Sequence, residues 1–388
     1  MDRQLTIRWV KTAGEIDAAL WMECFAPPLE GQWWYETLER SELQDQFDFS
    51  YAIISDAGKD VGIAPCFLMD VPMDLVAPPA VAWMLRQVGR VIPSVNYQRT
   101  LFIGSPCSDE GTVGLRAGVS LGDVAMVVQE AAAERAKTAR APMVVWKDFP
   151  PENEADLRAL AQKAGLFAVA SFPGTRVALP SGGFAGYLAA MTSSHRHNLK
   201  KKLKRGEALG ALTASVIQNP DPATREEIFG LFWQTYEKGE TKFEKLNRRF
   251  FQEIAKFDGA HWVLLRHASD NRLAAFMLCF LLGKRAINKF IGLDGTLQGD
   301  WYLYFRLWRE AVEWASQSGA SELQSGQTGY RAKLDLGHQL VPLTNYCRNS
   351  NPVTHWIYAK VAGGITWETL DHDLKNFMNS RRGQQRDG

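Results

Sequence analysis

The sequence predicts a mixed α/β protein built from two similar halves, and three observations support this. The chain has 388 residues, whereas single domains usually run to about 100–200 residues. Each half contains a strand, a polar turn and a long apolar strand in succession: YAIISDAGKDVGIAPCFLMD at 51–70 and HWVLLRHASDNRLAAFMLCFLLG at 261–283. Helical patterns follow the hairpin in both halves. Strands that pair first through turns and then through helices form mixed sheets.

The elements of the first half follow from the spacing of apolar residues. The hairpin turn contains Gly58, which tolerates the positive φ of a tight turn. Residues 71–98, rich in proline and apolar side chains, interrupt the pattern and are interpreted as an insertion. In chain order we expect a strand at 5–11, helices at 14–22 and 32–42, strands at 51–55 and 61–69, a helix at 119–139, a strand at 143–146 and a helix at 153–164.

The second half repeats this order, which indicates an internal duplication. We expect a strand at 212–217, helices at 223–238 and 247–257, strands at 261–266, 273–282 and 285–293, a helix at 302–318 and a strand at 322–324. The expected division of the chain is an N-terminal module at 1–182, a basic connecting helix at 183–208 and a C-terminal module at 209–388.

Composition excludes several classes of protein. Hydrophobic residues make up 46% and charged residues 22%, as in globular proteins, and the formal net charge is +1. The five cysteines are scattered and form no CxxC motif, so we expect no disulfide framework and no metal site. The most apolar stretch, 273–282, is shorter than the roughly 20 residues of a membrane span. With no signal peptide at the start, we expect a cytoplasmic protein.

The segment between the halves carries a local concentration of positive charge. Six of the eleven residues from His195 to Arg205 are Arg or Lys, and Leu199 and Leu203 are four apart, which predicts one helix with a thin apolar stripe. Arg196, Lys200 and Lys201 are candidates for binding a phosphate-bearing substrate, because such cations supply the sequence-independent part of nucleic-acid affinity. The alternative is a solvated helix face.

Four passages resemble the FemAB-like and CelD-like acyltransferases of the GNAT superfamily, which place two GNAT-like modules in tandem. They are Lys147-Asp-Phe149, the "F-x-x-Y-L" pattern and basic run from Phe184 to Arg205, the aromatic passage 232–251, and the glycine-flanked element Ser325-Gly-Gln-Thr-Gly-Tyr-Arg-Ala-Lys-Leu-Asp-Leu-Gly337. The resemblance covers about residues 140–345 and includes the Fem-type, peptidoglycan-related aminoacyltransferases.

The resemblance implies transfer of an acyl group to an amine, with acyl-CoA or aminoacyl-tRNA as donor and no tightly bound cofactor. CoA enzymes carry R/Q-x-x-G-x-G/A after the fourth strand, but Asp294-Gly-Thr-Leu-Gln-Gly-Asp-Trp301 has neither that spacing nor its charge. A Fem-like, aminoacyl-tRNA-dependent N-acyltransferase is therefore our first interpretation, with tRNA as a partner and an amine on a small molecule or peptide as acceptor. The alternatives are an acyl-CoA-dependent enzyme with a non-standard pyrophosphate loop and a non-catalytic binding module.

Lys333 is the leading catalytic candidate, since it matches the lysine of the family's glycine-flanked element. Its ammonium would stabilise the oxyanion that forms when an amine attacks an ester or thioester. The alternative is a solvated loop lysine. Gln327, Tyr330 and Arg331 are expected in the same loop as substrate-binding residues, with Arg331 able to hold a phosphate by two hydrogen bonds.

Three further residues complete the predicted site. Asn288 and Asp294 frame the strand that faces the reacting amine in GNAT-like folds, so Asp294 is a candidate to accept a proton or orient the amine. The alternative for Asp294 is a carboxylate that caps a turn. Tyr236 is a candidate to line the acceptor pocket, although its spacing also suits a core face. No Ser–His or Cys–His arrangement is visible, which favours direct transfer over an acyl-enzyme.

Overall fold

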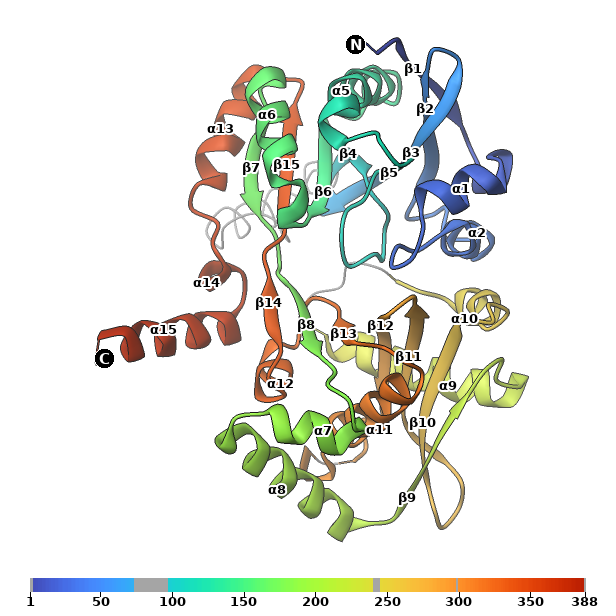
Figure 1. Cartoon of the computed structure of the whole chain (residues 1–388), viewed down its shortest axis with the longest axis vertical. Coiled ribbons are helices and arrows are strands. Elements are labelled where there is room, and N and C mark those ends of the chain that lie inside the picture. Colours follow the sequence, from blue (N-terminus) through green and yellow to red (C-terminus); the bar gives the residue numbers. More distant parts are fainter. Residues whose placement is uncertain (1–2, 73–96, 240–244, 298, 387–388) are drawn as a thin grey trace, which may run out of the picture. The chain divides into compact units, whose positions relative to one another are not determined.

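The computed structural model describes residues 3–72, 97–239, 245–297 and 299–386, so the predicted insertion at 71–98 lies almost wholly outside the described residues (Figure 1). The chain forms two compact units. Unit 1 consists of Met1–Ala26, Trp34–Phe172 and Pro342–Asp371, and unit 2 of Pro27–Trp33, Pro173–Val341 and His372–Gly388.

These units are bounded differently from the expected modules at 1–182, 183–208 and 209–388. The basic segment 183–208 packs within unit 2 and is not a separate connector. Residues 342–371 return to unit 1. Each unit is therefore assembled from three separate stretches of chain, which local periodicity does not reveal.

Unit 1 contains one mixed sheet, in the order β1-β2-β3-β4-β6-β15-β7, with β5 paired to β3. β4 and β6 are parallel, and the other neighbours are antiparallel. The strands are β1 (Leu5–Val10), β2 (Asp48–Asp56), β3 (Lys59–Pro72), β4 (Tyr97–Ile103), β5 (Gly114–Leu115), β6 (Met143–Phe149), β7 (Phe167–Ala170) and β15 (Thr344–Asn349).

Unit 2 also contains one mixed sheet, in the order β14-β8-β13-β12-β11-β10-β9. Here β12 and β13 are parallel, and the other neighbours are antiparallel. The strands are β8 (Gly174–Ala178), β9 (Leu212–Ile217), β10 (Ala260–His267), β11 (Leu273–Leu282), β12 (Arg285–Leu293), β13 (Glu322–Ser325) and β14 (Gln339–Val341).

The two sheets share one strand order and one pattern of directions. Read from β1 and from β9, each has three antiparallel pairings, then one parallel pairing, then two antiparallel ones. The helices occupy corresponding places between the strands. The predicted duplication and mixed α/β fold are therefore confirmed.

Each sheet takes one inner strand from a distant part of the chain. β15 lies between β6 and β7, and β8 lies between β13 and β14. The chain passes from β7 in unit 1 to β8 in unit 2, and from β14 back to β15 (Figure 1). β7, β8, β14 and β15 have three to six residues each. Such short strands give little periodic signal.

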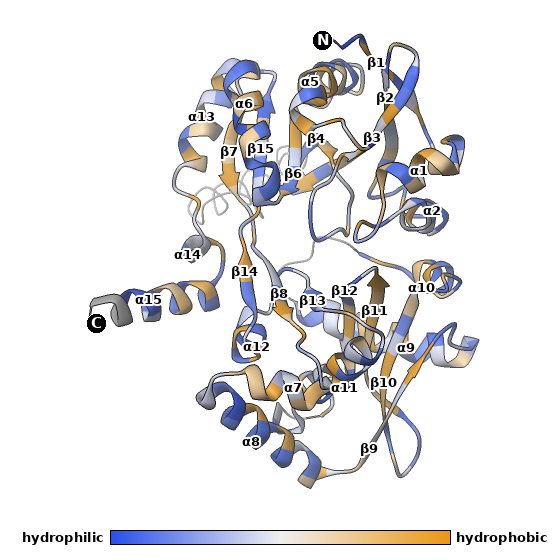
Figure 2. Cartoon of the chain, viewed as in Figure 1, coloured by the Kyte–Doolittle hydropathy of each residue, from blue (hydrophilic) through white to orange (hydrophobic). Residues whose placement is uncertain are grey.

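Amphipathic helices bury one face against each sheet. Val124 and Val128 of α5 pack in the unit 1 core with Trp146, and Leu307 of α11 packs in the unit 2 core with Met277. Figure 2 shows apolar colouring along β10 and β11 and mainly hydrophilic colouring along α8. The helices of unit 1 are α1 (Ala18–Cys24), α2 (Gln32–Arg40), α5 (Leu121–Thr138), α6 (Glu154–Ala164), α13 (Pro352–Ala362) and α14 (Trp367–Leu370). Those of unit 2 are α7 (Gly183–Ala190), α8 (Ser193–Leu209), α9 (Pro222–Lys238), α10 (Arg248–Ile254), α11 (Leu303–Gln317), α12 (Tyr330–Asp335) and α15 (His372–Arg386).

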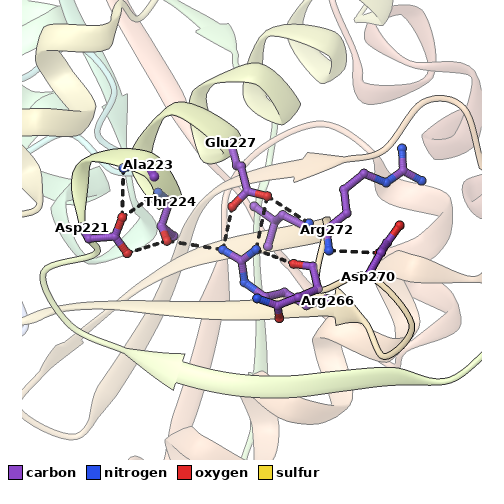
Figure 3. Close-up of polar contacts among 9 residues, drawn as sticks. Asp221, Ala223, Thr224, Glu227, Arg266, Asp270 and Arg272 are labelled. Atoms are coloured by element: carbon purple, nitrogen blue, oxygen red, sulfur yellow. Dashed lines mark hydrogen bonds and ion pairs between the residues drawn. The ribbon is translucent and has the colours of Figure 1, made fainter.

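A charged cluster ties α9 to the β10–β11 hairpin (Figure 3). The Glu227 carboxylate of α9 accepts hydrogen bonds from Nη1 and Nη2 of Arg266, at 3.2 and 2.7 Å. It also accepts one from the backbone N–H of Leu273 at 3.2 Å. Arg266 also donates to Thr224 Oγ1 at 3.3 Å and to the carbonyl of Asn271 at 2.8 Å. Two-pronged pairing of this kind fixes geometry as well as charge.

We expect Glu227→Gln to destabilise the hairpin by about 1–3 kcal/mol, because donors lose a charged acceptor. The adjacent Glu226→Gln is the matched control. Its partner Arg248 and Glu226 itself are both largely exposed, so that pair contributes about 0–1 kcal/mol. Amide hydrogen exchange over residues 266–276 measures the difference. Equal protection in the two variants would contradict a structural role for Glu227.

Candidate active site

The parallel pair of unit 2 ends after four residue pairs, from Arg285↔Glu322 to Asn288↔Ser325. The same four residues of β13 also pair with β8 on the other side. After Ser325 the chain leaves the sheet, while β12 continues to Leu293 with β11 as its neighbour. An edge of β12 without a strand partner among the described residues thus begins beside Ser325. Ligand sites of α/β proteins form where parallel strands end in this way.

Asn288 lies at this parting with an unsatisfied acceptor. Its side chain is buried, with the residue 5% exposed. Its Nδ2 donates to Ser325 Oγ at 3.3 Å, while Oδ1 has no hydrogen-bond partner among the described residues. The Tyr304 hydroxyl is also buried without a hydrogen-bond partner among the described residues, and burial raises the pKa of Tyr304 well above its ordinary range. A buried carbonyl oxygen without a donor is costly, so Asn288 Oδ1 is suited to accept an N–H from a ligand.

A β-bulge adjoins Asn288, and sequence analysis missed it. Leu278 pairs with Phe290 and Cys279 with Asn288, so Lys289 is the extra residue. The Lys289 side chain is 1% exposed, and its ammonium pairs with Glu30 at 2.6 Å. Nearby, Trp33 stacks on Phe257 with ring centroids 3.8 Å apart. The short stretch Pro27–Trp33 therefore completes unit 2. No sequence pattern links it to β12.

Lys333 lies on the short helix α12, in contrast to the loop that we expected. It is 7% exposed. Its ammonium donates to the carbonyl of Gly326 and, at 3.5 Å, to that of Gln327. Gly329, just before α12, has φ +63°, which lets the chain turn back over the end of β13. The buried Lys333 ammonium therefore points toward the loop that follows β13.

The other residues of this element have separate positions. Tyr330 is fully buried, and its hydroxyl donates to the Pro173 carbonyl at 2.9 Å, so it anchors α12 to the start of β8. Gln327 is half-buried, and its Nε2 is buried without a partner among the described residues. Arg331 is exposed, and its backbone N–H donates to Asp373 at 3.3 Å. The structure therefore brings Gln327, but not the side chain of Arg331, to the buried site.

His338, which sequence analysis passed over, lies behind Lys333. It is 5% exposed, and its ring centroid is 4.7 Å from that of Trp308. Burial, and then the Lys333 ammonium, lower the pKa of His338 well below its usual range. The imidazole is therefore neutral near pH 7. A neutral neighbour avoids repulsion with the Lys333 cation.

The basic helix α8 divides into structural and exposed cations. Nη1 of Arg196 donates to the carbonyls of Leu188, Ala189 and Met191 at 3.3–3.4 Å. The Arg196 guanidinium thus caps the C-terminal end of α7, because the last carbonyls of a helix have no partner within the helix. Lys200 and Lys201 are exposed.

Asp294 and Tyr236 have neighbours that suit structural roles. Asp294 Oδ1 accepts from Thr296 N at 2.9 Å and Thr296 Oγ1 at 2.6 Å, and Oδ2 lies 3.5 Å from Arg272. These contacts favour the turn-capping alternative for Asp294. Tyr236 on α9 packs near Trp233, with ring centroids 5.4 Å apart. Neither residue lies on α12 or at the last residue pair of β12 and β13.

The loop before α11 ends in a turn that contacts α8. A short 3-10 helix at Gly299–Trp301 precedes α11. A Cβ added at Gly206 of α8 would lie 2.6 Å from the Trp301 carbonyl, and one at Gly210 would lie 2.6 Å from the Trp301 ring. The loop is therefore packed closely against α8.

The corresponding point of unit 1 is built differently. β4 and β6 are also parallel, up to Ile103↔Trp146. There the following loop returns to β6: Gly111 N donates to the Asp148 carbonyl at 2.8 Å, and a Cβ at Gly111 would lie 2.0 Å from the Lys147 carbonyl. The buried Asp148 carboxylate accepts from Lys147 at 2.5 Å and from Ser171. This polar cluster is satisfied by its own residues.

Other kinds of site find no support in the described residues. No group of three or more His, Cys, Asp or Glu side chains there is arranged to hold a metal ion. All five cysteines are buried thiols outside any disulfide, and burial raises the pKa of Cys66 to about 12. None of the described helices has the length and apolar character needed to cross a membrane.

Comparison with known proteins identifies the fold. Residues 193–334 match the family model of the acetyltransferase (GNAT) domain. FemX is similar in structure, at 12% identity over 91% of this chain and 100% of that chain, with a TM-score of 0.58. A tandem GNAT protein from the clavulanic acid biosynthesis pathway has 11% identity over 90% and 99% of the chains, with a TM-score of 0.53.

A conserved protein of unknown function from Bacteroides thetaiotaomicron VPI-5482 is also similar, with 13% identity over 88% and 99% of the chains and a TM-score of 0.52. The search of curated proteins finds no match. The predicted resemblance to FemAB-like tandem GNAT proteins is therefore confirmed at the level of the fold.

We expect Lys289→Met to destabilise unit 2, since breaking a buried ion pair by removing one partner costs about 3–5 kcal/mol. Removing both charges, in Lys289→Met/Glu30→Gln, should recover part of this loss. Lys284→Met, in the turn between β11 and β12 where the residue is exposed, is the matched control. The free energy of unfolding of each variant is measured by chemical denaturation, with amide hydrogen exchange in β12 as the local readout. A double variant no more stable than Lys289→Met would rule out coupling between the two residues.

Proposed function

We propose that the chain is an N-acyltransferase whose site lies where β12 and β13 part in unit 2. The observation that carries this proposal is the placing of a buried cation, Lys333, on the element that leaves β13, together with the orphaned acceptor Asn288 Oδ1 at the last residue pair. A cation can stabilise the oxyanion that forms during amide formation, and a carbonyl acceptor can orient the attacking amine. The acyltransferase (GNAT) fold, matched over residues 193–334, supports it.

The reaction is a direct transfer. The acceptor amine attacks the carbonyl carbon of the donor, a C–N bond forms, and negative charge develops on the carbonyl oxygen. Lys333 stabilises that oxyanion, and Asn288 Oδ1 accepts an N–H of the attacking amine. The C–O or C–S bond to the leaving group then breaks, and the proton lost by the amine passes through solvent to the leaving group. In this proposal Gln327 Nε2 donates a hydrogen bond to the acyl donor.

Aminoacyl-tRNA is the donor we favour. The loop at 294–301 lacks the glycine spacing that cradles a pyrophosphate, and its Trp301 is packed against α8. Lys201 and Arg205, which are exposed cations of α8, instead suit a polyanion. Acyl-CoA is the second candidate, because the matched family model describes an acetyltransferase domain. We propose an amine on a small molecule or a peptide as acceptor.

Lys333→Met is expected to lower kcat by about 10²–10³ with little change in KM, because the contact is made mainly in the transition state. Lys284→Met, which removes an exposed ammonium from the same unit, is the control. Since Lys333 also holds the loop carbonyls, Lys333→Arg and the Tm of each variant are measured in parallel. A folded Lys333→Met protein with near-normal kcat would remove Lys333 from the mechanism.

A donor panel tests the class of substrate. Purified protein is incubated with charged tRNAs or with acyl-CoAs and a mixture of amines and lysine-containing peptides, and amide products are measured by mass spectrometry. We expect product from charged tRNA, abolished by prior RNase treatment. Product from acyl-CoA alone would establish the second donor. No amide product from either donor would favour a binding module.

A further inference from the structure

Three helices of unit 2 are joined around Lys333. α12, which carries Lys333, contacts both α8 and α15 (Figure 1). Lys202 of α8 pairs with Asp335 of α12 at 2.5 Å and lies 4.1 Å from the centroid of the Phe305 ring. On the other side, Leu374 of α15 is fully buried, and Asp373 accepts the Arg331 backbone N–H.

The acidic residues of these helices are used to assemble them. α8 has one acid, Glu207, which pairs with Arg309 of α11 at 2.6 Å. α12 has one, Asp335, which is bound to Lys202. α15 has one, Asp373, which is bound to α12. The charges left at the surface are consequently of one sign, although the whole chain has a net charge of only +1.

Helical spacing places some of these charges beside α12 and others away from it. Successive residues of a helix are about 100° apart. Lys201 and Arg205 lie within about 100° of Lys202, the residue that reaches α12, whereas Lys200 and Lys204 lie on the opposite side. All four are exposed.

Two further exposed arginines lie on the neighbouring helices. Arg331 is on α12 itself. Arg381 follows the buried Leu374 of α15 by seven residues, about two turns on the same face, and lies over Phe377 at 5.0 Å. Exposed cations thus lie on α12 and on the two helices that contact it.

We propose that Lys201, Arg205, Arg331 and Arg381 form one basic surface that binds the phosphate backbone of an RNA duplex. The inference rests on the proposed function, because the aminoacyl group of a charged tRNA is attached at the 3′ end of such a duplex. Arginines and lysines spread over neighbouring helices can contact successive phosphates. The surface positions the donor while Lys333 acts on its carbonyl. α15, which lies outside the matched residues 193–334, is thereby part of the donor site.

The surface suits RNA better than an anionic membrane. Membrane-surface helices combine cations with large apolar side chains on the facing side. The described residues of α12 and α15 include no exposed large hydrophobic residue, and α8 has one, Leu209, at its last position. Charge without an apolar face is the pattern of backbone recognition.

The test is binding of a fluorescent acceptor-stem RNA hairpin to the full chain by anisotropy, over a series of salt concentrations. Each phosphate contact contributes about −0.9 to the slope of log K against log salt. Replacing all four residues by Ala should therefore make the slope less negative by about 3–4. Lys201→Ala/Arg205→Ala should account for about half of that, and the control Lys200→Ala/Lys204→Ala, which removes the same charge from the same helix, should leave the slope unchanged.

Equal effects of the two pairs, a wild-type slope in the fourfold variant, or tighter binding to vesicles containing anionic phosphatidylglycerol than to the hairpin would each overturn the proposal. The outcome is separable from that of the proposed function. A fourfold variant that retains the slope and still transfers an aminoacyl group would refute the surface alone. A protein that binds RNA through these residues but uses only acyl-CoA would refute the proposed donor and retain the surface.

Discussion

The site of unit 2 depends on one constraint: β13 has only four residues, and all four are paired on both sides. Both ladders of β13 end at Ser325, where the chain leaves the sheet. The next residues of β12 then lack a strand neighbour on that side among the described residues. The side-chain oxygen Oδ1 of Asn288, at the last residue pair, is buried without a hydrogen-bond partner among the described residues.

The inserted strand β8 makes this constraint possible. Without it, β14 would be the natural partner of β13, as successive strands usually are. With β8 between them, the connection from β13 to β14 has to cross a strand, and α12 makes that crossing with Lys333 on it. The same exchange places β15 in unit 1. Neither sheet can therefore be completed by its own continuous segment of chain.

The two units share a strand order but differ in the polar groups at the point where their parallel strands separate. In unit 1 the loop after β4 packs on β6, and Asp148, Lys147 and Ser171 satisfy one another. In unit 2 the equivalent parting keeps an unsatisfied amide oxygen and a buried ammonium. Polar groups that are fully paired stiffen a fold, whereas those left unpaired are retained at a cost that binding can repay. At this point of the shared strand order, the unsatisfied Asn288 Oδ1 of unit 2 is the feature on which our proposed site rests.

By itself, the sequence determined the long elements and the duplication. β9, β11 and β12 lie at the predicted residues. β11 is a continuous apolar run next to turn residues, which is typical of a strand buried on both faces. It also placed Asn288, Gln327 and Lys333 among the candidates for one site. Only the tertiary structure decided the rest: the exchange of β8 and β15, the Lys289–Glu30 pair, and the roles of Arg196 and Tyr330 as anchors. Each of these depends on a contact between residues far apart in the chain, and such contacts leave no periodic trace in the segments that make them.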